Sequence, residues 1–235
     1  MKRYVFLVLA LACLLVSCSV DQTLITPTQE GFSDMEYFTQ DFTLRVELGG
    51  RKCVLLASGN LSITDEPKRM VGEMEQTLLG ENLGTVKVSW EDGKLYTDGE
   101  KQEMSWEELR TSLLYAPPIT FDEAEIKSAE SGNTLSGTLY RHYIKDNSKR
   151  DTLYALLGSA LPTLCGVNTV VEEETEFEDI VCEYVLDGNG NPVSYSIRFN
   201  VVYQDTPPYV PGVTPDKDEY TVKVGVEFRA SYKTE

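Results

Sequence analysis

The chain has 235 residues and a formal net charge of −17, from 38 acidic and 21 basic side chains. Such an acidic surface repels phosphates and anionic headgroups, which argues against a nucleic-acid-binding protein and against a polybasic membrane patch. Apolar residues make up 41% of the chain, and 13 residues are tyrosine. The chain can therefore bury a core, and its length fits one folded domain.

The first 17 residues have the three-part build of an export signal. Lys2 and Arg3 give a positive start, residues 4–16 are mainly apolar, and the small residue Ser17 precedes Cys18. The apolar run is shorter than the roughly 20 residues that span a bilayer. Residues 1–17 are therefore predicted to be a signal peptide. The alternative is an ordinary secretory leader or an uncleaved anchor, in which Cys18 has no special role.

The tetrapeptide LVSC, residues 15–18, resembles the lipobox of bacterial lipoproteins. The resemblance implies that Cys18 carries a diacylglycerol and becomes the first residue of the mature chain. Two acyl chains anchor stably, because each buried methylene contributes about 0.8 kcal/mol. Ser19 is not the aspartate that retains some lipoproteins in an inner membrane. We therefore expect an extracytoplasmic protein whose partner is the membrane, the outer one if the source has two.

Residues 18–36 are mostly polar and show no periodicity, so we expect a lipidated cysteine followed by a flexible tether. A single domain should then fill residues 37–235. Its dominant pattern is the alternation of apolar and polar residues, which is typical of strands with one buried face. The expected strands are residues 42–48, 51–64, 70–78, 86–90, 94–97, 134–144, 180–186, 193–203 and 220–232. A further arm, residues 124–130, could be a strand or a helix, with a hairpin turn at residues 131–133.

Two helices interrupt the strands. Ser105 and Glu108 form a capping box at the start of the first helix, which should run over residues 106–115 with Trp106, Leu109 and Leu113 on one face. The second should run over residues 148–161. A sheet of nine to eleven antiparallel strands tends to curl. We therefore predict an α+β fold, a large curved antiparallel sheet with about two helices on its concave face.

Three segments carry a resemblance to a known family. They are VLLASGNLSITDEPKRMVGEMEQTLLG, TVKVSWEDGKLYTDGEKQEMSWEEL and YVLDGNGNPVSYSIRFNV. With the lipobox leader, this order of elements resembles the LolA/LolB lipoprotein-carrier superfamily and its lipoprotein relatives of the LppX and LprG type. The resemblance implies an incomplete barrel, a sheet wrapped around helices, often with an apolar cavity for acyl chains.

The apolar face of the third and fourth strands and the first helix is the candidate ligand site. Its residues are Met70, Met74, Leu78, Val86, Val88, Trp90, Trp106, Leu109 and Leu113. Methionines suit adaptable apolar pockets, and they also fill ordinary cores. The leading hypothesis is a non-catalytic lipoprotein that binds a lipid or another apolar ligand. The alternative is a structural or protein-interaction lipoprotein with a filled core, whose acidic loops meet a protein partner.

Other candidates for chemistry have simpler interpretations. His142, the sole histidine, belongs to no catalytic or metal motif and is interpreted as a surface residue of a strand. Residues 187–192 begin like a calcium loop, but Pro192 and Arg198 stand where glycine and glutamate are required, so we predict a hairpin turn. The acidic run 172–179 fits a solvated loop or edge strand, or a weak site for a cation or basic partner. No enzyme, metal or cofactor is expected.

Three cysteines remain beyond the leader, namely Cys53, Cys165 and Cys182. Their spacing matches no zinc signature. Outside the cytoplasm a disulfide could form, and Cys165 with Cys182 would close the shortest loop and leave one thiol free.

Overall fold

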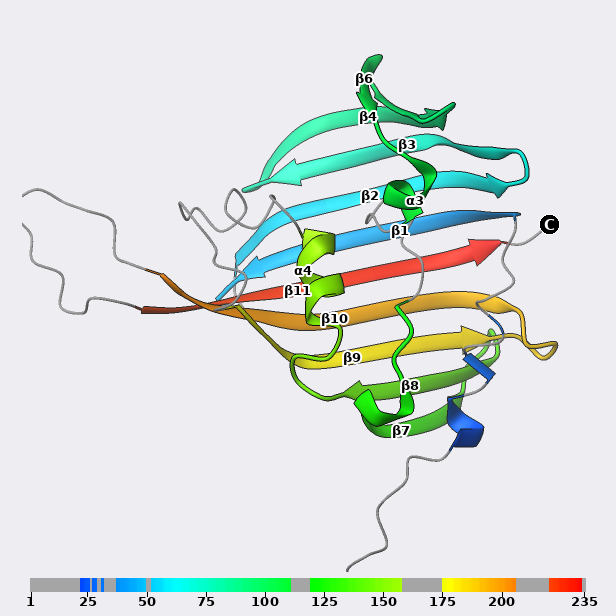
Figure 1. Cartoon of the computed structure of the whole chain (residues 1–235), viewed down its shortest axis with the longest axis vertical. Helices are drawn as coiled ribbons and strands as arrows, with labels where there is room; N and C mark the ends of the chain where they lie inside the picture. The colour runs from blue at the N-terminus through cyan, green and yellow to red at the C-terminus, as the bar shows by residue number, and fades with distance from the viewer. Residues whose placement is uncertain are drawn as a thin grey trace, which may run out of the picture.

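The computed structural model describes residues 22–25, 27–28, 31, 37–49, 52–110, 119–157, 175–205 and 220–233. These residues form an eleven-stranded antiparallel sheet with the order β6-β5-β4-β3-β2-β1-β11-β10-β9-β8-β7. The predicted fold class, a large antiparallel sheet with two helices, is confirmed. The order leaves β6 and β7 as the two edges, so the sheet is open (Figure 1).

The first half of the sheet is a meander in which each strand pairs with the one before it. Its strands are β1 (Tyr37–Leu48), β2 (Lys52–Asp65), β3 (Lys68–Leu78), β4 (Glu81–Glu91), β5 (Lys94–Thr97) and β6 (Glu100–Glu103). Gly49 and Gly93 turn the chain at positive φ, which glycine adopts without strain. The short edge strand β6 was not predicted, because its sequence EKQE is entirely exposed and polar.

The second half is also a meander, and it follows the 3-10 turn η2 (Glu123–Glu125). Its strands are β7 (Ile126–Asn133), β8 (Thr138–Ile144), β9 (Glu176–Leu186), β10 (Pro192–Asp205) and β11 (Tyr220–Lys233). The arm that the sequence left open is thus a strand. The hairpin turn predicted at residues 131–133 is wrong, because those residues continue the ladder until Asn133 faces Thr138. The turn closes instead where the amide of Thr134 donates to Gly137 O at 2.8 Å.

The two meanders meet where β1 pairs with β11, in the middle of the sheet. Side chains on one face of this junction are buried aromatic and aliphatic residues. Phe42 stacks on Phe228 with ring centroids 6.2 Å apart, and Phe38 meets Tyr232 edge to face at 5.7 Å. We call this the inner face. The opposite, outer face carries polar residues such as Thr43 and Arg45.

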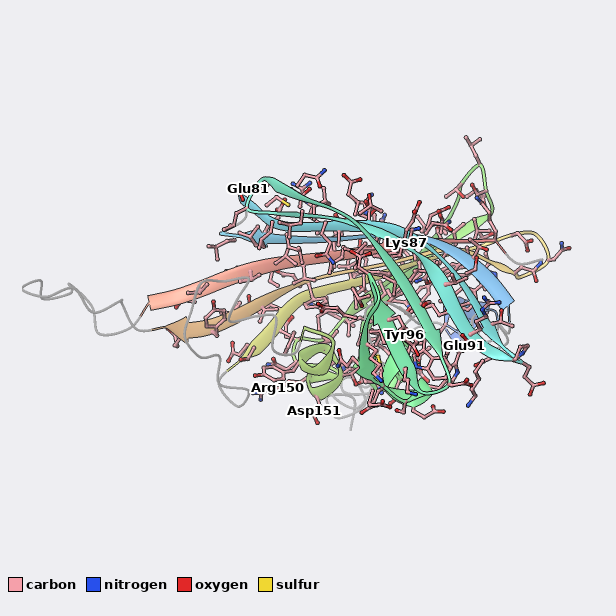
Figure 2. The ribbon with its side chains drawn as sticks, turned by 90° about the horizontal axis from the view of Figure 1, so that it is seen from above. Glu81, Lys87, Glu91, Tyr96, Arg150 and Asp151 are labelled. Carbon is pink, nitrogen blue, oxygen red and sulfur yellow. The ribbon has the colours of Figure 1, made fainter. Side chains whose placement is uncertain are left out.

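Both helices lie on the inner face, as predicted. Helix α3 (Trp106–Arg110) lies in front of β2 and β1 in Figure 1, and α4 (Arg150–Leu157) lies in front of β11 and β10. Ser148 and Lys149, predicted to open the second helix, form a turn instead, and residues 111–115 and 158–161 of the predicted helices lie outside the described part of the chain. Figure 2 shows the curl of the sheet, because β4 runs obliquely from Glu81 until Glu91 reaches the side on which α4 lies.

Part of the segment expected to be a flexible tether is packed against the domain. The 3-10 turn η1 (Gln22–Leu24) is followed by Ile25, which belongs to the core cluster, and by Thr28, which is also buried. The Thr28 hydroxyl donates to Ile25 O at 2.7 Å and closes this turn. The described residues of the expected tether thus include a turn that packs on the domain, at residues 22–25 and 27–28.

Candidate apolar binding site

The register of β3 and β4 brings the predicted site residues together on the inner face. Met70 pairs with Trp90, and Met74 pairs with Val86. Gly72 lies between the two methionines and faces Val88. Because side chains two residues apart share a face of a strand, these positions form one continuous apolar surface.

One half of this surface is fully packed, and we call it the packed half. Its residues are all at most 5% exposed, namely Met70, Val88, Trp90, Trp106 and Leu109. The Trp90 and Trp106 rings lie 4.7 Å apart. Both indole N–H groups are satisfied, because Trp90 donates to Met104 O and Trp106 donates to the Asp65 carboxylate, each at 2.7 Å. Buried tryptophans need such partners, so this half is a finished core.

The start of α3 fixes Trp106 over the packed half. The predicted capping box is confirmed, because the Glu108 amide donates to the Ser105 hydroxyl at 3.1 Å and the Ser105 amide donates to the Glu108 carboxylate at 2.7 Å. The hydrogen bond from the Ser105 amide to the carboxylate lowers the pKa of the Glu108 carboxyl. Trp106 is the first residue after the cap, and it and Leu109 pack toward the sheet.

The other half of the surface is only half-buried, and we call it the open half. It consists of the predicted residues Met74, Leu78 and Val86, together with two residues that the sequence analysis missed, Leu48 and Leu55. Leu55 lies directly opposite Leu78 in the β2–β3 ladder. The predicted residue Leu113 lies outside the described part of the chain. The open half is a strip of partly exposed aliphatic and thioether side chains.

Two grooves on the outer face offer a different chemistry. The larger measures about 610 Å³ and is lined by charged and amide side chains, among them Arg45, Arg198 and Asn200. The smaller measures about 460 Å³ and includes Glu183 and Arg229. Ionised side chains at the wall of a groove would have to lose water against an apolar ligand, which is unfavourable. These two grooves therefore do not suit an apolar ligand.

His142 is not a surface residue, and that interpretation is corrected. Its side chain is 2% exposed and points to the inner face, where Nε2 lies 3.0 Å from Leu24 O. The ring packs against Tyr184 with centroids 5.1 Å apart. Burial lowers the pKa of the imidazole. His142 therefore joins the N-terminal segment to the core.

Cys182 is a free thiol, and the possible disulfide with Cys165 stays a prediction. Its side chain is fully buried on the inner face, 4.0 Å from the Tyr195 hydroxyl, and burial raises the pKa of the thiol to about 12. Cys165 itself lies outside the described residues, and Cys53 is also a free thiol.

The turn predicted at residues 187–192 is confirmed. The Asp187 carboxylate accepts from the amides of Asn189 and Asn191 at 2.8 and 2.9 Å, which closes the hairpin and lowers the pKa of that carboxyl. Residues 172–174 of the acidic run lie outside the described residues. Within the run, Glu178 and Asp179 both bind Lys223 at 3.3 Å. No cluster of metal-ligating side chains occurs in the described ranges.

Comparison with known proteins gives structural likenesses only. No protein-family model and no curated protein gives a significant match. The lipoprotein LppX of Mycobacterium tuberculosis is similar over 91% of this chain and 94% of its own, with 10% identity and a TM-score of 0.44. A LolA superfamily protein of Nitrosomonas europaea is similar over 92% and 94%, with 7% identity and a TM-score of 0.28.

Proposed function

We propose that this protein is a non-catalytic, extracytoplasmic lipoprotein, anchored through a diacylglycerol on Cys18, that binds a lipid or another apolar ligand at the open half. The observation that carries the ligand proposal is the half-burial of Met74, Leu78 and Val86 on the inner face, beside a half that is fully closed. Water-exposed apolar area on a concave face is what an acyl chain covers favourably, at about 25 cal/mol per Å².

The anchor proposal rests on the leader and the lipobox. Within the described residues no helix is long and apolar enough to span a bilayer. Cys18→Ala should remove the protein from the membrane fraction, because the leader alone cannot span. A variant that stays membrane-bound through the same segment would contradict the anchor.

The ligand proposal is tested by lipid extraction and mass spectrometry of the protein purified from its native membrane. Wild type should release a co-purified amphiphile. Met74→Asp places a charge in the open half and should abolish this amphiphile. Val71→Asp is the matched control, because Val71 lies three residues away on the same strand, faces outward and is 43% exposed. Extracts without an amphiphile, or equal amounts from both variants, would contradict ligand binding.

The second candidate function is a structural or protein-interaction lipoprotein with no ligand. It is favoured by the packed half, where two tryptophans and a methionine already fill the space between sheet and helix. In that case wild type, Met74→Asp and Val71→Asp should all be free of lipid, while Cys18 still anchors the chain.

A further inference from the structure

The N-terminal segment that packs on the domain, within residues 22–31, limits how the domain can be oriented on its membrane. Residues 18–36 as a free tether would reach roughly 60 Å, at 3.3–3.6 Å per residue. However, η1 begins at Gln22, only four residues after Cys18. The chain between Cys18 and the start of η1 can therefore span at most about 14 Å.

The packed segment is held by several independent contacts. Ile25 is 5% exposed within the core cluster, and Leu24 O lies 3.0 Å from the buried His142 imidazole. Further along, Gly31 lies so close to the β9–β10 turn that a Cβ there would meet Gly190 O at 2.7 Å. The segment thus follows one end of the sheet, from β7 to the β9–β10 turn (Figure 1).

The tip of the β7–β8 hairpin lies at the same end. A Cβ on Gly137 would meet Leu186 O at 1.9 Å, so the hairpin tip lies against the backbone of Leu186. The side chain of Leu186 lies against Gly31. Leu186 therefore separates the hairpin tip from the packed segment. Leu135 stands at this tip and is fully exposed. The tip is held in place, since Thr134 makes hydrogen bonds to Gly137 through both its backbone and its side chain.

We propose that η1 fixes the domain on the membrane by its β7–β8 corner, with Leu135 in contact with the lipid surface. This inference rests on the proposed anchoring through Cys18. Across eleven strands at about 4.8 Å each, the sheet is roughly 50 Å wide. This is much more than the short chain between Cys18 and η1, which we call the leash, can span. The β3–β4 hairpin, which carries the exposed Leu83, lies at the far corner (Figure 1). The partner is a zwitterionic lipid surface, because the acidic chain repels an anionic one.

The test uses the full lipidated protein on phosphatidylcholine vesicles. A cysteine replaces Leu135, Leu83 or Val71 in a background where Cys53 and Cys165 are serine, and it carries an environment-sensitive fluorophore. Brominated lipids should quench the label at 135 at least threefold more than at 83 or on the outer face at 71. Equal quenching at all three positions, or stronger quenching at 83 or 71, would overturn the orientation.

A second variant keeps the fold and changes only the leash. Ten Gly/Ser residues inserted after Ser19 should leave vesicle flotation unchanged and lower the quenching at 135 at least twofold, because the corner is no longer held close. Unchanged quenching would overturn the role of the short leash. Flotation separates the two proposals, since protein that fails to float contradicts the anchor, whereas floating protein without quenching at 135 contradicts the orientation alone.

Discussion

The packed half and the open half share two strands, one face and one kind of side chain, and they differ in what covers them. Met70 is fully buried, whereas Met74, two positions along the same face and beyond Gly72, is half-buried. The difference comes from Trp90 and from α3, which brings Trp106 over one end of the surface. The same alternation of apolar residues along β3 and β4 thus gives a fully buried core where aromatic residues cover it. It gives a partly exposed strip where they do not.

Gly72 marks the boundary between the halves. A Cβ at this position would lie 2.0 Å from Asn60 O and 2.8 Å from Leu61 Cδ2, so the neighbouring strand occupies the space of a side chain. The close approach of β2 at this point is possible because residue 72 is glycine.

The largest effect should come from Trp106→Ala in the packed half. Removing a buried indole and its hydrogen bond to Asp65 should lower the free energy of unfolding by about 3–5 kcal/mol. Guanidinium chloride unfolding measures this loss. Trp106→Phe, which keeps an aromatic ring, should cost less than half as much. A loss below about 1 kcal/mol for the alanine variant would mean that the packed half is not packed.

A somewhat smaller effect is expected at the boundary. Gly72→Ala forces β2 and β3 apart and should cost about 1–3 kcal/mol in unfolding free energy. Gly132→Ala is the control, because a Cβ there meets nothing within 4 Å. It should change stability by no more than about 0.5 kcal/mol. Equal losses of unfolding free energy in the two variants would show that β2 does not approach residue 72 closely.

The difference in burial between the two halves is tested by the same substitution on each side of Gly72. Met74→Ala should cost about 1 kcal/mol, because a half-buried side chain has less apolar area to lose. Met70→Ala, in the packed half, should cost about 2–5 kcal/mol. Urea unfolding of both variants decides the matter. If Met74→Ala costs as much as Met70→Ala, the open half is core and the ligand proposal loses its support.

The smallest expected effect is a dependence of stability on pH that comes from His142. The packed half and the open half, whose side chains are neutral, should not show it. Burial lowers the pKa of His142 in the folded state, so the unfolded state binds more protons just below pH 6.5. The stability contributed by neutral His142 is present above this pH and is lost as the pH falls toward the lowered pKa. The facing Cys182 and Tyr184 stay neutral, since burial raises both pKa values.

Thermal unfolding of wild type and His142→Gln between pH 5 and 7 measures this dependence. The difference in unfolding free energy between the two proteins should shrink as the pH falls below about 6.5. A difference that is constant across this range would show that His142 does not titrate with folding.

Most strands could be predicted, because alternation reports which side chains turn inward. The edge strand β6 could not, since all its residues face water and no alternation exists. His142 was misplaced because its neighbours Tyr140 and Tyr143 put aromatic rings on both faces of β8, which hides the inward side. The packed turn around Ile25 has too few residues for any period.

The candidate site was predictable as a face but not as two halves. Alternation placed Met70, Met74 and Leu78 on one side, yet coverage depends on where α3 lies over the sheet, which is a tertiary property. Leu48 and Leu55 were missed for a related reason. Leu55 comes to lie opposite Leu78, and Leu48 joins the same face, only through the pairing of β1, β2 and β3, which no single stretch of sequence shows.

The pairing of β1 with β11 has a consequence for export. If the chain crosses a membrane from its N-terminus, as proposed, β1 emerges first and its partner Tyr220–Lys233 emerges last. Ordering a loop of this length before the contact forms makes closure slow. The two meanders can each form along the way, but Phe42 meets Phe228 only after the final strand has crossed. Under this proposal the sheet can be completed only after β11 has crossed.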